Sequence, residues 1–327
     1  MNTPLMNNDN PRILILGGSG FIGSSLCEQL TQHYGGRARI TVPTRRLRHA
    51  QEVQGLPGLT VIAADVFDAP SLQRLVADAD VVVNLIAILQ GNDAAFERAH
   101  VELPRRLVAA GGGVGKTRLI HVSALGAAVD SPPSRYLRSK AAGEAVLTAA
   151  PGLALTLLRP SVVFGEHDKF INLFAKLQGV FPVMPLAGAS VKFQPVWVED
   201  VAAALLRCID DRNTVGQVYE IAGPQVLTLR QIVRLAGEIS GHARPILPLP
   251  GPLAWAQAVA MELAPGEPLM SRDNLASMKV PNVAGGVLPG LAALGITPQS
   301  ISAVVPAYLA GGQGCARLDA WRSKAGR

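Results

Sequence analysis

Residues 14–23 read LILGGSGFIG, and this stretch decides the fold. It completes an apolar run and opens an amphipathic segment, residues 21–34, in which apolar side chains recur every fourth position. Gly17, Gly20 and Gly23 satisfy the pattern G-x-x-G-x-x-G. Glycine at these positions allows a tight turn, lets the backbone approach a pyrophosphate and packs helix against strand. The stretch therefore predicts a strand–turn–helix unit that binds a dinucleotide at the helix N-terminus.

Five further apolar runs follow in the first half of the chain. Together with the first run they are the strands that we expect, at 12–16, 40–42, 59–63, 81–89, 118–122 and 153–158. Several are apolar on both faces, which is typical of a parallel sheet covered by helices on each side. Because helix-like segments separate the runs, the sequence predicts an α/β fold with a doubly wound parallel sheet, the Rossmann arrangement.

The rhythm of strands and helices changes beyond residue 165. Residues 191–210 predict one more strand and a helix that returns to the first domain. The other expected helices lie near 170–178, 228–240, 252–264, 271–278 and 298–309. We expect a flexible tail at 1–10, a dinucleotide-binding domain and a smaller, mostly helical C-terminal domain. The boundaries expected for the two domains are 11–165 plus about 191–215, and 166–190 plus 216–327.

Composition limits the class of protein. The chain has 327 residues, of which 49% are hydrophobic and 17% charged, which excludes a disordered chain and allows about two domains. No uninterrupted apolar stretch reaches the ~18–20 residues of a membrane span, and residues 1–10 do not resemble a signal peptide. Cys27, Cys208 and Cys315 lie far apart, so neither a disulfide framework nor a zinc site is expected. The composition favours a cytoplasmic protein without a metal site.

The basic residues favour one form of the dinucleotide. Lys and Arg outnumber Asp and Glu by 30 to 24, and five arginines lie within residues 37–48. No aromatic residues alternate with them, so a stacking platform for nucleic acid is not expected. An NAD site usually carries Asp or Glu at the end of the second strand, whereas here Arg45 and Arg46 stand there. Guanidinium groups suit a 2′-phosphate, with hydrogen bonds worth about 1.5–3 kcal/mol each, which favours NADP(H) over NAD(H).

A second motif is Tyr136-Leu-Arg-Ser-Lys140. The spacing of four residues places Tyr136 and Lys140 on one helical face, one turn apart. A nearby ammonium group lowers the pKa of a tyrosine, as a general acid or base near neutral pH requires. Ser123 follows the strand 118–122, at the carboxyl end of the sheet where ligands bind. The three residues predict a hydride-transfer set; the alternative is an exposed helix with an incidental Tyr/Lys pair.

Other patterns carry less weight. The segment GGGVGKT at 111–117 imitates a phosphate-binding loop, but its glycines are too closely spaced and it precedes a strand instead of a helix. Residues 166–168, Glu-His-Asp, predict a polar loop, because adjacent residues rarely converge on one metal ion.

The segment 247–266 lacks the Lys and Arg of a membrane-surface helix and is expected to pack within the second domain. His121 is expected in the core, and Asp65 fits either an acceptor for the adenine amine or a turn residue.

Several motifs together carry a resemblance. They are LGGSGFIG, VVVNLIAI, LIHVSALGA, SRYLRSKAAGEAVL, LRPSVVFGEHDKFIN, QPVWVEDVAAAL and LPGLAALGITPQSI. With them, nearly the whole chain resembles the atypical extended short-chain dehydrogenase/reductase (SDR) family. Within that family it looks most like the group that contains the NADPH-binding accessory subunit of respiratory complex I and its bacterial relatives. SRYLRSKAAGE followed by RPSVVFG is specific to this group.

The resemblance implies which residues bind NADP(H). The residues implied for the glycine loop and for binding of the 2′-phosphate are Gly17, Ser19, Gly20, Phe21, Ile22, Gly23, Arg45 and Arg46. Those of the adenosine side are Asp65, Val66, Leu85, Ile86 and Ala87. Those of the nicotinamide side are Tyr136, Lys140, Pro160 and Val163.

Two functions follow from the resemblance. The first is a binding subunit, in which the nucleotide is structural or regulatory and the protein docks on complex I or another membrane-associated assembly. Its location would then be peripheral, on the cytoplasmic face of the inner membrane. The alternative is an NADP-dependent oxidoreductase or epimerase/dehydratase that acts on a quinone-, isoprenoid- or sugar-like substrate. In that enzyme Tyr136 moves a proton, Lys140 holds the ribose and Ser123 orients a carbonyl or hydroxyl.

Overall fold

The structure is a computed structural model that describes residues 10–111, 117–263 and 268–309. Most of the segment GGGVGKT, nearly all of the expected tail and Cys315 lie outside the described residues. The chain forms two compact units. The first unit draws its residues from 1–160, 198–221 and 284–297, and the second from 161–197, 222–283 and 298–327.

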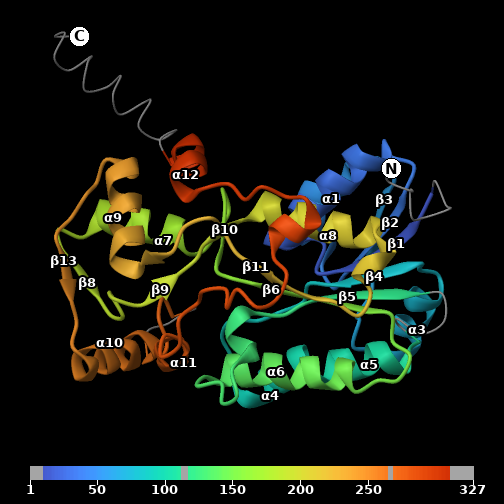
Figure 1. The fold of residues 1–327 in the computed structure, drawn as a ribbon, viewed down its shortest axis with the longest axis horizontal. Coiled ribbons are helices and arrows are strands. Elements are labelled where there is room, and N and C mark those ends of the chain that lie inside the picture. The colour runs from blue at the N-terminus through green and yellow to red at the C-terminus, as the bar shows by residue number, and fades with distance from the viewer. Residues whose placement is uncertain (1–9, 112–116, 264–267, 310–327) are drawn as a thin grey trace, which may run out of the picture. The chain divides into compact units, whose positions relative to one another are not determined.

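Seven parallel strands form the sheet of the first unit, in the order β11-β6-β5-β4-β1-β2-β3 (Figure 1). Their bounds are β1 Arg12–Leu16, β2 Arg39–Thr44, β3 Leu59–Ala63, β4 Val81–Asn84, β5 Arg118–Val122, β6 Leu155–Pro160 and β11 Val218–Ile221. The order reverses between β1 and β4, and ligands of such sheets bind outside the carboxyl ends of the strands at that point. The sheet confirms the predicted doubly wound α/β fold.

Helices cover both faces of this sheet. Their bounds are α1 Phe21–Tyr34, α2 Gln51–Gln54, α3 Ala69–Ala77, α4 Asp93–Glu97, α5 Leu103–Ala109, α6 Arg135–Thr148 and α8 Val198–Asp210. Figure 1 shows α1 and α8 on one face, and α3, α5 and α6 on the other. A π-helical turn, Arg98–Glu102, joins α4 to α5. The bounds of α1 match the expected helix at 21–34.

The core explains why the central strands are apolar on both faces. Every residue of β4 and β5 is buried, and so are four of the five residues of β1. Leu14, Val82, Leu119 and Leu157 come from four neighbouring strands and belong to one apolar cluster. Burial of each such side chain stabilises the fold by about 1.5–3 kcal/mol. Because both faces of the sheet are covered, these strands do not alternate apolar and polar residues as the strands of a half-exposed sheet do.

The expected strand at 81–89 is too long. β4 ends at Asn84, because the Asn84 Oδ1 atom accepts a hydrogen bond from the Ile86 backbone N–H at 3.2 Å and turns the chain out of the sheet. Asn84 Nδ2 lies 3.1 Å from Nδ1 of His121 on β5, so the oxygen and the nitrogen of the Asn84 amide each have a hydrogen-bond partner. Residues 85–88 are therefore a loop at the carboxyl edge of the sheet, although they are as apolar as the strand before them.

The units differ from the expected domains at their boundaries. Residues 216–221 lie in the first unit because β11 pairs with β6. The segment 284–297 also lies there, and the Glu220 carboxylate accepts a hydrogen bond from the Gly285 backbone N–H at 2.7 Å. Residues 191–197 belong to the second unit, where their strands pair with others of that unit.

The second unit is built from helices and short two-stranded sheets. Its helices are α7 Ile171–Val180, α9 Leu229–Ser240, α10 Gly251–Leu263, α11 Arg272–Ser277 and α12 Ile301–Leu309. Its strands are β7 Val163–Phe164, β8 Met184–Leu186, β9 Lys192–Phe193, β10 Val196–Trp197, β12 Leu227–Thr228 and β13 Ile246–Pro248. Phe164, Phe174 and Ile232 lie in one apolar core. Among the described helices of the whole chain, none has the length and apolarity needed to cross a membrane.

Candidate functional site

The glycine loop between β1 and α1 is too tight for side chains. Gly17 adopts a φ of +86°, a conformation that side chains disfavour. A Cβ atom on Gly17 would lie 3.3 Å from the Ile86 nitrogen, and one on Gly23 would overlap the carbonyl oxygen of Gly17 and the backbone of Gly18. Glycine is therefore required at both positions, as the sequence predicted. The loop also lies directly against Leu85 and Ile86.

The N-terminus of α1 is arranged to bind an anion. Gly20 is the N-cap residue, its backbone is extended, and no side chain of the described residues caps the helix. The first turn contains no acidic residue. The backbone N–H groups of a first helical turn have no partner within the helix, and the helix dipole adds positive potential. Phe21 and Ile22 are half-buried and Ser19 precedes them, so the N–H groups of this turn are available to a pyrophosphate.

The loop after β4 forms the wall that faces the glycine loop. Three hydrogen bonds fix it: Leu85 N donates to Leu16 O at 2.9 Å, Ile86 N to Asn84 Oδ1 at 3.2 Å, and Ile88 N to His100 Nε2 at 3.1 Å. Leu85 and Ile86 are half-buried and Ala87 is exposed. Of the predicted adenosine-side residues of this loop, Leu85 and Ile86 thus lie beside Gly17.

Arg45 and Arg46 directly follow β2. Both are exposed, and neither side chain forms a hydrogen bond or ion pair with any described residue. The Thr44 hydroxyl bonds to the backbone N–H and carbonyl of Arg46 at 3.2 Å each, which shapes the turn. The two guanidinium groups therefore lie at the carboxyl end of β2, and their N–H groups donate to no described residue.

Asp65 and Val66 follow β3. Asp65 is exposed, and its Oδ1 atom accepts a hydrogen bond from the Phe67 backbone N–H at 3.0 Å, as in a turn. Val66 is buried in the apolar core. The Val66 side chain packs inward, so only its backbone is available to a ligand at this edge.

Of the three predicted catalytic residues, Ser123 directly follows β5, and Tyr136 and Lys140 lie on α6, all in the first unit. Lys140 is only 2% exposed, and its Nζ atom donates a hydrogen bond to the Val122 carbonyl oxygen at 2.7 Å. Burial lowers the pKa of Lys140 to about 8, against an opposing effect of the Glu144 carboxylate. Ser123 is 3% exposed, and its Oγ atom has no hydrogen-bond partner among the described residues. A buried hydroxyl without a partner costs about 1–3 kcal/mol, so this atom is suited to a ligand.

The pKa of Tyr136 shifts in the direction opposite to the sequence-based expectation. Burial of the hydroxyl raises the pKa of Tyr136 to about 12. The ammonium group of Lys140 was expected to lower it, and in the structure this group donates its hydrogen bond to the Val122 carbonyl oxygen on β5. The phenol is consequently protonated near neutral pH, which suits a proton donor.

The polar side chains that support α6 were not predicted from the sequence. Glu144 on α6 and Arg159 on β6 form an ion pair in which both carboxylate oxygens accept hydrogen bonds, at 2.5 to 3.1 Å. Asn84 and His100 fix the loop after β4. Glu144 and Arg159 both stand within the motifs quoted for the resemblance, so the signal was present, whereas nothing in the sequence marks His100.

Pro160 and Val163 fall in different units. Pro160 ends β6 and pairs with Ile221 in the first unit, and Val163 begins β7 and pairs with Val196 in the second. Pro160 therefore lies at the end of the strand that neighbours β5, which Ser123 follows.

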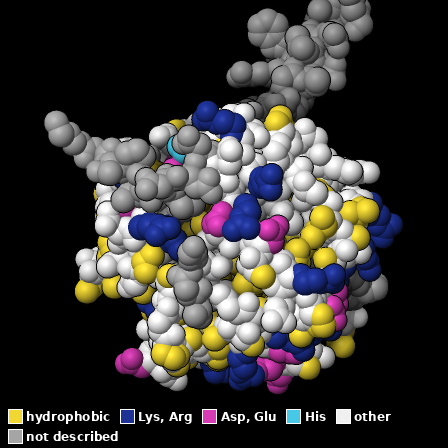
Figure 2. Space-filling view, turned by 90° about the vertical axis from the view of Figure 1, so that its right-hand side faces the viewer, with side chains coloured by type: hydrophobic (Ala, Val, Ile, Leu, Met, Phe, Trp, Pro, Cys, Tyr) yellow, Lys and Arg dark blue, Asp and Glu magenta, His cyan; other side chains and the backbone are white. Residues whose placement is uncertain are grey.

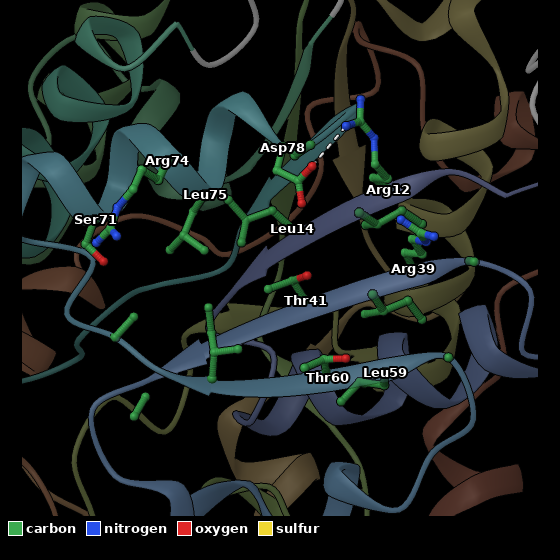
Figure 3. A pocket seen from close by; sticks show the side chains of 18 of the residues that line it. Arg12, Leu14, Arg39, Thr41, Leu59, Thr60, Ser71, Arg74, Leu75 and Asp78 are labelled. Atoms are coloured by element: carbon green, nitrogen blue, oxygen red, sulfur yellow. Dashed lines mark hydrogen bonds and ion pairs between the residues drawn. The ribbon is translucent and has the colours of Figure 1, made fainter.

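A cavity of about 780 Å³ lies elsewhere in the first unit and contains none of the predicted nucleotide residues. Figure 3 shows its floor, with Thr41 and Thr60 on neighbouring strands, and its wall, with Arg74 and Asp78 at α3. Arg12 closes one end through an ion pair with Asp78 at 3.0 Å. Within the described residues, no cluster of three or more His, Cys, Asp or Glu side chains is suited to hold a metal ion.

The basic residues do not gather into one patch on the side of the molecule that carries β3. Figure 2 shows Lys and Arg side chains on this side dispersed among Asp and Glu, with neutral surface between them. Nucleic-acid binding proteins instead cluster their basic side chains on one face.

Comparisons with known proteins find a matching family and several relatives. Residues 13–222 match the family described as "NAD dependent epimerase/dehydratase family". The chain is 31% identical to the mouse protein "NADH dehydrogenase [ubiquinone] 1 alpha subcomplex subunit 9, mitochondrial", over 87% of this chain and 76% of the mouse protein. The Arabidopsis thaliana protein of that name is 36% identical over 75% of this chain, and the chain spans 61% of its length.

A solved structure shows the same fold. It is the UDP-glucuronic acid 4-epimerase from Bacillus cereus in complex with UDP-glucuronic acid and NAD. The TM-score is 0.66 at 18% sequence identity, and the match covers 91% of this chain and 98% of that chain.

Proposed function

Because the chain belongs to the NAD dependent epimerase/dehydratase family of extended SDR proteins, we propose that it binds NADP(H) and resembles the accessory subunit of complex I in function. The observation that carries this proposal is the close approach of Gly17 to Leu85 and Ile86, beside a helix N-terminus without a side-chain cap. This cradle accepts backbone contact with a pyrophosphate and leaves no room for a side chain. Arg45 and Arg46 support the choice of a 2′-phosphate over a free hydroxyl.

Each part of the cradle has a separate task. The N–H groups at the start of α1 bind the pyrophosphate, and Leu85, Ile86 and Ala87 contact the adenosine side. Lys140 binds the nicotinamide ribose, and its carbonyl partner on β5 keeps the ammonium group in place. A bound nicotinamide supplies a hydride donor or acceptor at its ring. Titration with NADPH and NADH tests the proposal, and a failure of both to bind would contradict it.

We propose in addition that the protein associates with complex I or a related membrane assembly, as the names of its relatives suggest. It would then be a cytoplasmic protein held peripherally on the inner membrane. Affinity purification of the tagged protein from its own cells, after mild detergent extraction, tests this proposal. Complex I subunits in near-stoichiometric amount are the expected result, and recovery of the protein alone would contradict it.

A second candidate function is an NADP-dependent oxidoreductase or epimerase/dehydratase. The unpartnered Ser123 hydroxyl and the protonated Tyr136 favour it, because both are suited to donate hydrogen bonds to a carbonyl oxygen. In a reduction, Tyr136 gives its proton to the forming alkoxide. The expected substrate is a quinone-, isoprenoid- or sugar-like carbonyl compound. Tyr136→Phe should abolish turnover and leave NADPH affinity nearly unchanged; full turnover in this variant would exclude the mechanism.

A further inference from the structure

His100 lies at the centre of a buried contact between three segments. It stands in the π-helical turn Arg98–Glu102 and is 2% exposed. π-Helical turns inside helices occur frequently at functional sites. The carbonyl of His100 lies so close to α6 that a Cβ atom on Gly143 would overlap it. The His100 ring meets the Tyr136 ring edge to face, with centroids 5.6 Å apart and an angle of 80°.

The hydrogen bonds of His100 determine its tautomer. Ile88 N donates to Nε2 at 3.1 Å, so Nε2 carries no proton. The proton is therefore on Nδ1, which donates to Ser139 Oγ at 2.7 Å. The Ser139 hydroxyl in turn donates to the Tyr136 carbonyl oxygen at 2.7 Å. One imidazole thus joins the loop after β4 to Ser139 on α6.

These hydrogen bonds also exclude proton transfer through the His100 ring. Nε2 faces a backbone N–H that cannot release its proton, so no proton passes through the ring from Ser139. Burial, together with the Lys140 ammonium, lowers the pKa of His100 to about 3, and the ring stays neutral at the pH of a cell. A role as general acid or base is therefore excluded, and a role in holding other groups remains.

We propose that His100 is a positioning residue, which ties the nucleotide-facing loop 85–88 to α6 through Ile88 N and Ser139 Oγ. The loop lies against Gly17 and α6 carries Tyr136 and Lys140, so His100 makes the two sides of the nucleotide site move together. Binding of the dinucleotide at the loop then orders α6 as well. This inference rests on the proposed function, because it assigns a task to His100 within the NADP(H) site.

Two substitutions of His100 separate its two hydrogen bonds. In His100→Gln the amide oxygen replaces Nε2 and keeps the bond from Ile88 N, and the bond to Ser139 is lost. In His100→Asn the amide nitrogen replaces Nδ1 and keeps the bond to Ser139, and the bond from Ile88 N is lost. Ser139→Ala is the matched control, because it breaks the same bond as His100→Gln without touching the ring.

Dinucleotide affinity and amide hydrogen exchange, measured on the full chain with NADPH, test the inference. We expect His100→Asn to weaken NADPH binding about ten-fold, which corresponds to about 1.4 kcal/mol, and to speed exchange of the Ile88 amide. We expect His100→Gln and Ser139→Ala to stay within about three-fold of wild-type affinity. In wild type, NADPH should slow exchange in α6, and this slowing should be lost in His100→Gln and Ser139→Ala.

The outcomes distinguish the inference from the proposed function. If the wild-type protein binds neither NADPH nor NADH, the proposed function is overturned, and the role of His100 with it. If the wild-type protein binds NADPH and the two His100 variants bind it equally, whether tightly or weakly, only the inference is overturned. Slowing of exchange in α6 that persists in Ser139→Ala also overturns it.

Discussion

The carboxylate of Glu144 on α6 receives three hydrogen bonds from the guanidinium group of Arg159 on β6. The side chains are 7% and 17% exposed, so the pair is largely screened from solvent. It raises the pKa of Arg159 further above its ordinary value. The pair holds the helix that carries Tyr136 and Lys140 against the strand that ends at Pro160.

We therefore expect Glu144→Ala to lower the free energy of unfolding by about 2–4 kcal/mol, because Arg159 is left with a largely buried, uncompensated charge. Denaturant unfolding measures the loss. Glu102→Ala is the control, since Glu102 forms a half-exposed i, i+4 pair with Arg106, and should cost less than about 1 kcal/mol. Equal losses in the two variants would contradict the structural role of the Glu144 pair.

A methyl group at Gly23 should disrupt the glycine loop. Gly23→Ala forces the backbone of Gly17 and Gly18 to move, so we expect NADPH binding to fall at least about 100-fold and stability by about 1–3 kcal/mol. Gly179→Ala on α7 is the control, because no described atom beyond its chain neighbours and the nearby backbone of α7 lies within 4 Å of the point where its Cβ would stand. It should stabilise the protein by up to about 1 kcal/mol. Calorimetric titration and thermal unfolding measure the two effects. Wild-type affinity in Gly23→Ala would place the nucleotide elsewhere.

Arg45→Ala should change the choice of nucleotide. Loss of one charge-assisted hydrogen bond to a 2′-phosphate predicts about a 10- to 150-fold weaker affinity for NADPH and an unchanged affinity for NADH. Arg48→Ala, at an exposed position three residues further on, is the control and should leave both affinities unchanged. An unaltered NADPH/NADH affinity ratio in Arg45→Ala would show that the arginines after β2 do not bind the phosphate.

The buried histidines make stability depend on pH in the acid range. Burial and the Lys140 charge lower the pKa of His100 to about 3 and that of His121 well below 6.5, and His100 itself also acts on His121. The unfolded chain therefore binds more protons than the folded chain between pH 6.5 and about 3, so stability falls as the pH falls through this window. The expected slope is up to about 1.4 kcal/mol per pH unit for each histidine. Unfolding at pH 7, 6 and 5 measures it, and His100→Gln should reduce the slope.

Lys140 should lower the stability of the fold while it contributes to dinucleotide binding. Its folded pKa of about 8 lies below the ordinary 10.5, so the charged form destabilises the fold below pH 8, and this cost disappears as the pH rises toward 10.5. Lys140→Met removes the cost, and we expect it to raise the free energy of unfolding at pH 7 by about 1–3 kcal/mol while it weakens dinucleotide binding. Denaturant unfolding at pH 7 and 10 tests this, since the difference between variant and wild type should shrink at pH 10.

Local patterns were sufficient to predict much of the first unit. β1, β3, β5 and α1 begin and end where the apolar runs and the amphipathic period place them. Burial on both faces leaves a clear signal in β1 and β5, whereas β3 is partly exposed and was marked by its apolar run alone. The error at β4 came from one side chain, since Asn84 turns an apolar stretch out of the sheet.

The supporting contacts of the site were not predictable in the same way. His100 contacts Ile88 and Ser139, which are 12 and 39 residues away in the chain, and no period connects them. The rise in the pKa of Tyr136 depends on burial of its hydroxyl, which is a tertiary effect. The glycine loop was predictable because its constraint is steric and local.

The placement of β11 has a consequence for synthesis of the chain on the ribosome. β6 ends at Pro160 and pairs with β5 on one side, but β11, which pairs with its other side, begins only at Val218. The segment 284–297, which contacts β11, is translated later still. At ~5–20 residues per second, the nascent sheet keeps the edge of β6 unpaired for several seconds. An unpaired edge of a hydrophobic strand invites pairing with other chains. A fragment that stops at residue 160 should therefore aggregate, and early nascent chains depend on protection until β11 emerges.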